Sequence, residues 1–384
     1  MSRRDNFLSK PISSYYLLLG STAALTGLGL VMILSASSIH SLETNGSSYA
    51  IFLRQCVFLL IAIPCGFAAS RLPIARWKAL GKVSLLIAIA MLLALRVPGV
   101  GHSINGNTNW LGYGPFVFQP SEFAKFLLVL WAGHMMASRE RSSRGETNVL
   151  LLLVPGFAIV MLLIMAGRDL GNAAVFASIL LGLLFISGIR LKIIALGAVI
   201  ITVLVSALIY TTPNRMRRVL VVLNPFSDEY YKLSGWQPAH SIMGLASGGL
   251  FGVGLGASRQ KWGNLAEAHT DFIFSVIGEE LGLLGTLCVL LLLATLIFSI
   301  FRIAIRANDP MIRYASAGIG CWIATQTVLN IGSATSTLPV VGVTLPLLSY
   351  GGSSVIATYL GLGFVLGAAL RDPAIAPVIK RVKK

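Results

Sequence analysis

Long, continuous apolar runs are the feature that most limits what this 384-residue chain can fold into. A helix needs roughly 20 mostly apolar residues to cross a bilayer core of about 30 Å. Inside lipid the backbone must satisfy its own hydrogen bonds, so spanning segments are helices or closed barrels. The runs here are too long for barrel strands, which need only about 10 residues. The sequence therefore predicts an all-α polytopic membrane protein.

The composition agrees with a membrane location. Hydrophobic residues make up 55% of the chain and charged residues 11%, whereas a soluble domain carries about a quarter charged residues. The basic start of the chain leads into a full-length apolar run, which favours a retained anchor over a cleaved signal peptide. The four cysteines lie inside apolar runs without metal-ligand spacing, so we expect core residues rather than disulfides.

About ten spans are expected, with a long extracytoplasmic loop before the eighth. They lie at approximately 16–38, 51–70, 79–97, 120–138, 149–167, 170–188, 191–211, 271–300, 313–335 and 351–370. The fourth and ninth are less apolar than the others. We expect a single integral membrane domain over residues 1–384, with short tails at 1–15 and 371–384 and the large loop at about 212–270.

The distribution of basic residues sets the expected orientation. The net charge is +16, and 20 of the 30 Lys and Arg residues fall in one set of connections between the runs. Cytoplasmic loops carry such an excess of Lys and Arg. Both termini are therefore expected in the cytoplasm, and the segments 98–119 and 212–270 outside. Because topology explains the basic residues, no nucleic-acid partner is expected.

Glycines recur every four residues in the long outer loop, at Gly244, Gly248, Gly252 and Gly256. On a helix they would line one face and allow close approach of another backbone. This pattern has two compatible interpretations. The segment packs tightly on the bundle, which we favour, or its glycine face admits a lipid or a sugar.

Two charged residues near the start of the fourth span, Glu122 and Lys125, are three residues apart on one helical face. They form a structural ion pair, or Lys125 holds an anionic group near the outer leaflet while Glu122 orients it. Gln119-Pro120-Ser121 is typical of a helix start, with proline in the first turn. The positive end of that helix would face the same outer region.

Other polar residues in or beside the spans favour structural roles. Arg168 and Asp169 fill a short outward turn, where a local ion pair is the simpler explanation. Gln326 and Asn330 are four residues apart in the ninth span. We expect both to make hydrogen bonds between helices.

The stretch "NLAEAHTDFIFSVIGEELG", residues 264–282, holds four of the 14 acidic residues of the chain. Asp271 is expected at the outer mouth of the eighth span. Glu279 lies eight residues further along, about 12 Å deeper on a helix, so these two do not form a close carboxylate pair. Glu279 and Glu280 are expected inside the bundle, bonded to backbone or to serines and glycines of neighbouring helices.

A carboxylate at the membrane surface can act as a general base when a partly apolar site raises its pKa. Arginines bind phosphate through paired hydrogen bonds. The outer face supplies these candidate cations: Arg54, Lys125, Arg215, Arg217, Arg218, Arg259 and Lys261. Such a site fits transfer from a phosphorylated lipid carrier. The residues alone also allow a transporter or scaffold in which Asp271 caps its helix.

The motifs resemble those of the SEDS family, the FtsW and RodA proteins of bacterial cell-wall synthesis. The resemblance covers nearly the whole chain. The segments that carry it are "ILSASS", "FLRQ", "INGNTNWLGYGPFVFQPSEFAK", "RMRRVLVVLNPF", "SGGLFGVGLGASRQK", "AEAHTDFIFSVIGEELG" and "LPVVGVTLPLLSYGGSS". Their order and spacing, with ten spans and cytoplasmic termini, are similar to the family architecture.

The resemblance implies a peptidoglycan glycosyltransferase that polymerises lipid II into β-1,4 glycan strands. The essential aspartate of the family corresponds to Asp271, as general base on the acceptor hydroxyl. The Glu and Lys pair of the family corresponds to Glu122 and Lys125, and its arginines to Arg54 and Arg218, as substrate contacts. Neighbouring motif residues expected at the substrate are Gln119, Ser121, Lys261, His269 and Thr270.

The resemblance also implies a multi-pass protein of the bacterial plasma membrane with a class B penicillin-binding transpeptidase (FtsI-like) and other division proteins as partners. "EAHTDFIFSVIGEELG" and "RMRRV" favour FtsW, and hence septal synthesis. A RodA-like elongation polymerase, a lipid II flippase and a structural subunit stay open. No cofactor is evident, and a divalent cation at the pyrophosphate is left open.

Overall fold

The computed structural model of the protein describes residues 10–378, apart from 98, 100, 105–106, 114–115, 142–147 and 212. Ten of its helices coincide with the ten expected spans. They are α1 (Ile12–Asn45), α2 (Ala50–Arg71), α3 (Ile74–Ala94), α4 (Pro120–Arg141), α5 (Val149–Ala166), α6 (Leu170–Ile186), α7 (Leu191–Tyr210), α11 (Ile273–Arg306), α12 (Pro310–Ala334) and α13 (Gly352–Leu370). The prediction of a largely helical, polytopic membrane protein is confirmed.

Six helices in the described part are long and apolar enough to cross a membrane: α1, α2, α3, α5, α11 and α13. Apolar helices α6 and α7 are shorter. The two less apolar helices, α4 and α12, are the fourth and ninth expected spans, and both are mostly buried among their neighbours. The count of ten membrane crossings stays a prediction.

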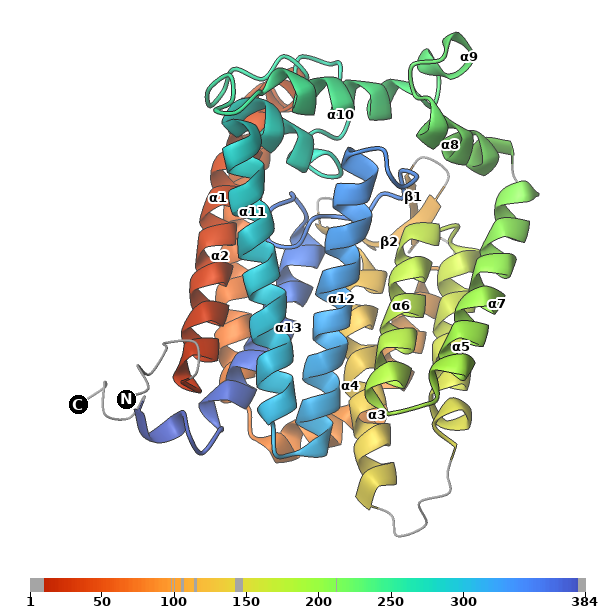
Figure 1. Cartoon of the computed structure of the whole chain (residues 1–384), viewed down its shortest axis with the longest axis vertical. Coiled ribbons are helices and arrows are strands. Elements are labelled where there is room, and N and C mark those ends of the chain that lie inside the picture. Colours follow the sequence, from red (N-terminus) through yellow and green to blue (C-terminus); the bar gives the residue numbers. More distant parts are fainter. Residues whose placement is uncertain are drawn as a thin grey trace, which may run out of the picture.

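The long segment before α11 forms three short helices, α8 (Pro213–Leu223), α9 (Asp228–Tyr231) and α10 (Trp236–Ser247). They lie at one end of the bundle, whereas α1 begins and α13 ends at the opposite end (Figure 1). The predicted topology requires this arrangement. Which end faces the cytoplasm stays a prediction, and the expected tails lie partly outside the described residues.

A small sheet interrupts the otherwise helical chain between α3 and α4. Strands β1 (Gly101–Ile104), β2 (Asn107–Tyr113) and β3 (Phe116–Phe118) pair antiparallel in chain order. An all-α fold was expected, so this sheet was missed. The sequence signal was the dipeptide Asn105-Gly106, which is typical of two-residue hairpins.

Helix α11 is broken at Gly282, whose φ of 68° and ψ of −164° are not helical. The segment 249–254 supplies hydrogen bonds that the break removes. The amides of Val253 and Gly254 donate to the carbonyls of Glu279 and Glu280 at 2.9 and 3.1 Å. In return the amides of Leu283 and Leu284 donate to the carbonyls of Gly249 and Leu250 at 2.9 and 3.2 Å. The backbone therefore stays satisfied through the break.

The glycine pattern has a different structural basis from the expected one. Helix α10 ends at Ser247, and Gly252 and Gly256 have φ of 81° and 80°, so the four glycines do not share one helical face. The expected tight packing of this segment on the bundle is nevertheless present. A Cβ on Gly248 would overlap the carbonyl of Gly278, and one on Gly252 would overlap the carbonyl of Glu280. These glycines allow the loop backbone to reach the backbone of α11.

Candidate active site

Asp271 lies in a tight turn directly before α11. The carbonyl of Glu267, which has a φ of 58°, accepts hydrogen bonds from the amides of Thr270, Asp271 and Phe272 at 3.1, 3.1 and 3.3 Å. The N-cap of α11 is Phe272, and no side chain caps it. The alternative in which Asp271 serves as a helix cap is therefore wrong. The carboxylate of Asp271 is thus not used to cap α11.

The pKa of Asp271 is raised to about 7. Burial is the main cause, because it disfavours the ionised form. The negative charge of Glu267 raises the pKa further, and the positive charge of Arg218 opposes both effects. A base with a pKa near the working pH combines ionisation with proton affinity, as general-base catalysis requires.

His269 packs between two rings rather than facing an anion. Its ring centroid lies 5.5 Å from that of His40 on α1 and 5.5 Å from that of Tyr350. Burial lowers its pKa to about 4, the charge of Glu267 opposes this, and His40 lowers it further. His269 is thus neutral at pH 7. Its carbonyl accepts from the amide of Tyr350 at 2.9 Å, so His269 helps to position the turn, and its expected contact with the substrate stays a prediction.

Thr270 also serves the turn. Its hydroxyl donates to a carboxylate oxygen of Glu267 at 2.9 Å, and its carbonyl accepts from the hydroxyl of Ser349 at 2.6 Å. The segment 335–351, between α12 and α13, thereby holds the turn from the other side.

Two exposed arginines flank this region. Arg218 on α8 donates to the carbonyl of Val340 at 3.3 Å, and its charge acts on Asp271. Arg54 on α2 donates to the side chain of Asn45 at 3.2 Å. Burial raises the pKa of Tyr350, and the nearby charge of Arg54 lowers it. Because Tyr350 packs on His269, Arg54 belongs to the same neighbourhood as the acid.

Glu122 and Lys125 form the expected ion pair, with Nζ 2.6 Å from a carboxylate oxygen. Lys125 has 0% exposure and lies 5.5 Å from the ring centroid of Trp322 on α12. The lysine therefore faces the interior of the bundle. Its position supports the structural interpretation, rather than direct capture of an anion at the outer surface.

Gln119 and Ser121 take part in a buried network that sequence reasoning missed. Asp169 caps α6 by accepting from the amide of Asn172 at 2.9 Å, and the side chain of Asn172 donates to Asp169 at 2.8 Å and to Ser121 at 3.2 Å. The amide of Gln119 donates to the hydroxyl of Ser353 at 2.8 Å. The carboxyl of Asp169 thus accepts hydrogen bonds from Asn172, and in the described part of the chain no ion pair joins it to Arg168, contrary to the expectation. Burial raises the pKa of Asp169.

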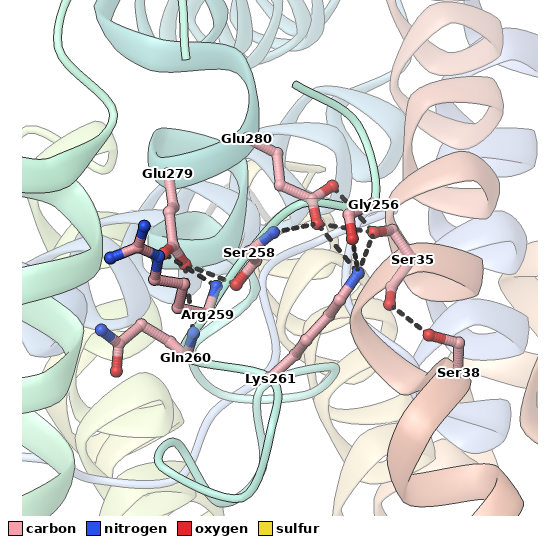
Figure 2. Close-up of polar contacts among 9 residues, drawn as sticks. All are labelled: Ser35, Ser38, Gly256, Ser258, Arg259, Gln260, Lys261, Glu279 and Glu280. Atoms are coloured by element: carbon pink, nitrogen blue, oxygen red, sulfur yellow. Dashed lines mark hydrogen bonds and ion pairs between the residues drawn. The ribbon is translucent and has the colours of Figure 1, made fainter. Parts of the chain in front are cut away.

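Lys261 is tied to the buried acid Glu280 (Figure 2). Its Nζ lies 3.4 Å from a carboxylate oxygen of Glu280, 3.3 Å from the hydroxyl of Ser35 and 2.6 Å from the carbonyl of Gly256. Three protein acceptors occupy the ammonium group. Lys261 therefore fastens the loop to α1 and α11, and its position does not support the expected substrate contact.

The two glutamates of α11 bond as expected to backbone and serine. Glu280 accepts from the hydroxyl of Ser35 at 2.7 and 2.8 Å. Glu279 accepts from the hydroxyl of Ser258 and from the amide of Arg259 at 2.9 Å. Figure 2 shows both carboxylates directed at the loop. Glu279 and Glu280 join α11 to residues 258–259 and to α1, and they do not form a catalytic pair with Asp271.

The arrangement is that of a partly buried base with two exposed arginines in its neighbourhood. The base comes from the turn before α11, and the arginines come from α2 and α8. This chemistry suits removal of a proton from a hydroxyl beside a phosphorylated group. Arg218 acts on Asp271 itself, and Arg54 acts on Tyr350, which packs on the same turn. Lys125 and Lys261 are buried and pair with other acids, Glu122 and Glu280.

Comparisons with known proteins agree with this geometry. The family model described as "Cell cycle protein", for FtsW, RodA and SpoVE, matches residues 16–372. A probable peptidoglycan glycosyltransferase FtsW of Mycobacterium tuberculosis is 36% identical over 99% of this chain and 72% of that protein. The corresponding protein of Tolumonas auensis is 39% identical over 91% of this chain and 90% of that protein.

Solved structures match as well. A chain from a peptidoglycan synthase complex that coordinates polymerization and crosslinking has a TM-score of 0.75, with 28% identity over 93% of this chain and 97% of that chain. The rod shape determining protein RodA of Thermus thermophilus has a TM-score of 0.68 at the same identity, over 93% of this chain and 97% of that chain. The resemblance inferred from the motifs is confirmed: the chain belongs to the FtsW/RodA/SpoVE family of cell cycle proteins.

Proposed function

We propose that this protein is a peptidoglycan glycosyltransferase that polymerises lipid II in the bacterial plasma membrane. The observation that carries the proposal is the position of Asp271. Its side chain does not cap α11, it is partly buried, and its pKa is about 7. A base of this kind is required to deprotonate a sugar hydroxyl. The family membership and the names of the relatives point to the same reaction.

In the proposed reaction, Asp271 accepts the proton of the acceptor 4-hydroxyl. The hydroxyl oxygen forms a bond to the anomeric carbon of the donor, and the bond from that carbon to the carrier pyrophosphate breaks. Attack from the opposite face inverts the α-linked carrier bond to a β-1,4 linkage. Arg54 and Arg218 stabilise the pyrophosphate that leaves, because guanidinium groups pair with phosphate oxygens.

A divalent cation would have few protein ligands here. No group of three or more His, Cys, Asp or Glu side chains in the described part could hold a metal ion. The carboxylates of Asp271 and Glu267 are the nearest donor set on this turn, and Asp271 is needed as a base. No step of the mechanism is assigned to a protein-held metal, and a divalent cation held mainly by the pyrophosphate stays open.

A solved peptidoglycan synthase complex contains a chain that is similar to this one. We propose that this chain likewise works with a class B penicillin-binding transpeptidase, and that its role is septal, because the relatives are named FtsW. Cytoplasmic termini belong to this proposal, since they place Asp271 on the side where the glycan grows.

The test uses proteoliposomes that contain the purified protein, its transpeptidase partner and lipid II. Wild type is expected to form glycan polymer, and Asp271→Asn is expected to form none. Asp228→Asn is the matched control, because Asp228 is an exposed acid in the same outer segment. Movement of lipid II across the bilayer without polymer, unaffected by Asp271→Asn, would favour a flippase instead.

A further inference from the structure

Asn330 on α12 is a buried side chain that the proposed mechanism has not used. Its amide nitrogen donates to the carbonyl of Asp271 at 2.9 Å and to the carbonyl of Val343 at 2.8 Å. It is 1% exposed. One amide group therefore joins the turn that carries the acid to the segment between α12 and α13.

Residues 342–343, on the other side of this link, form a wall that faces the carboxylate of Asp271. Gly342 precedes Val343 and has a φ of 70°. A Cβ at Gly342 would lie 3.5 Å from Oδ2 of Asp271 and would meet no other atom within 4 Å. The absence of a side chain at residue 342 thus leaves open space directly in front of the acid.

Other contacts hold the turn, but they act earlier in it. Ser349 bonds the carbonyl of Thr270 at 2.6 Å, and the amide of Tyr350 donates to the carbonyl of His269 at 2.9 Å. Within the described residues, Asn330 is the side chain that bonds the backbone of Asp271 itself. The distance between the acid and its facing wall therefore depends on this asparagine.

We propose that Asn330 and Gly342 are positioning residues: Asn330 fixes the gap between Asp271 and the 342–343 wall, and Gly342 leaves that gap wide enough for an acceptor hydroxyl. The inference rests on the proposed function, in which Asp271 takes the proton. A base must come within about 2.6–3.2 Å of the oxygen it deprotonates. A methyl carbon at residue 342 would lie 3.5 Å from Oδ2 and would crowd an oxygen that approaches from that side.

A purely structural role for Asn330 is separable from a positioning role. Gln326 lies one turn earlier on α12, is also 1% exposed and bonds Trp322 within its own helix. Gln326→Ala therefore removes a comparable buried amide without touching the acid. It is the matched control for Asn330→Ala.

The first measurement follows the carboxyl group of Asp271 by infrared titration, with Asp271→Asn as the reference that removes its signal. The charged groups facing the carboxyl are Glu267 on its own turn and Arg218 on α8, and the variants leave both unchanged. Asn330→Ala is expected to lower the titration midpoint, since a released turn gains water. Gln326→Ala is expected to leave it unchanged. This measurement needs no lipid II, so it tests the inference even if polymerisation fails.

The second measurement is polymerisation. A misplaced base is expected to reduce kcat for Asn330→Ala by roughly ten- to a hundredfold, with KM little changed. Gly342→Ala is expected to reduce kcat and, because a φ of 70° strains alanine, to lower the unfolding temperature slightly. Gly263→Ala, at a φ of 89° with no atom within 4 Å of the added Cβ, is the control for that strain and is expected to keep kcat. A wild-type midpoint in folded Asn330→Ala, or equal damage from Gln326→Ala, would overturn the role of Asn330. Full activity of Gly342→Ala would overturn that of Gly342.

Discussion

Arg218 on α8 donates a hydrogen bond of 3.3 Å to the carbonyl of Val340, two residues before the glycine that faces Asp271. The outer segment and the loop between α12 and α13 are thereby joined beside the acid. The charge of Arg218 also lowers the pKa of Asp271 against the effects of burial and of Glu267. One side chain thus affects both the shape and the electrostatics of the site.

Replacing Arg218 is expected to shift the pH dependence of polymerisation. In Arg218→Ala the pKa of Asp271 rises above its value of about 7, because an opposing positive charge is lost. The rise of kcat/KM with pH should then occur at higher pH. The pH–rate profile measures this, and Arg217→Ala, at an exposed neighbour on α8, is the control. Identical profiles for Arg218→Ala and wild type would contradict the assigned interaction.

Glu267 is expected to act in the opposite direction. Wild-type activity should increase as pH rises through about 7, since only ionised Asp271 accepts a proton. Glu267→Gln removes a negative charge that raises this pKa, so the increase should occur at lower pH. Glutamine keeps an acceptor for the hydroxyl of Thr270. An increase displaced to higher pH would show that Glu267 works through the shape of the turn instead.

The ionisation of Asp271 is expected to reduce stability. Its folded-state pKa of about 7 lies above the ordinary value of 3.8, so the folded protein binds this proton more tightly than the unfolded chain. The resulting stabilisation is present below pH 4 and is lost as pH rises through about 7. Asp271→Asn should therefore unfold at a higher temperature than wild type at pH 8. The difference should vanish towards pH 4, and a pH-independent difference would argue against the raised pKa.

The ion pair of Glu122 and Lys125 should show strong coupling in a double-mutant cycle. Lys125→Met leaves a buried carboxylate without its partner, which is expected to cost about 3–5 kcal/mol. The additional change Glu122→Gln should recover much of that loss, because no uncompensated charge remains. Equilibrium unfolding of the two single variants and the double variant measures the coupling. Additive losses would mean that the two side chains do not depend on each other.

The helices could be predicted because lipid imposes a local rule. An apolar run of sufficient length must satisfy its own backbone, whatever lies beside it. The acids of "GEELG" were also placed correctly, since a carboxylate inside a bundle needs donors and the nearby loop offers them. The position of Asp271 at the start of the eighth span could be predicted from the sequence. Its role as a general base came from the resemblance of its motif to the family.

The remaining features depend on partners that are distant in the sequence. Buried Lys125 lies against Trp322, which is almost 200 residues away in the sequence. Gln326 was expected to bond another helix, but its partner is Trp322 one turn away in α12. Asn330 was also expected to bond another helix, but its partners lie in the turn before α11 and in the segment between α12 and α13. Nothing in the spacing indicated that its partners would be the carbonyls of Asp271 and Val343.

The break in α11 at Gly282 has a consequence for how this protein can change over time. Residues 249–254 complete the backbone hydrogen bonds of the helix, and the helix completes theirs. Neither segment is a self-sufficient module. A chimera that takes the loop from one relative and the helix from another must keep both sets of glycines in register, so the two segments are expected to be inherited together.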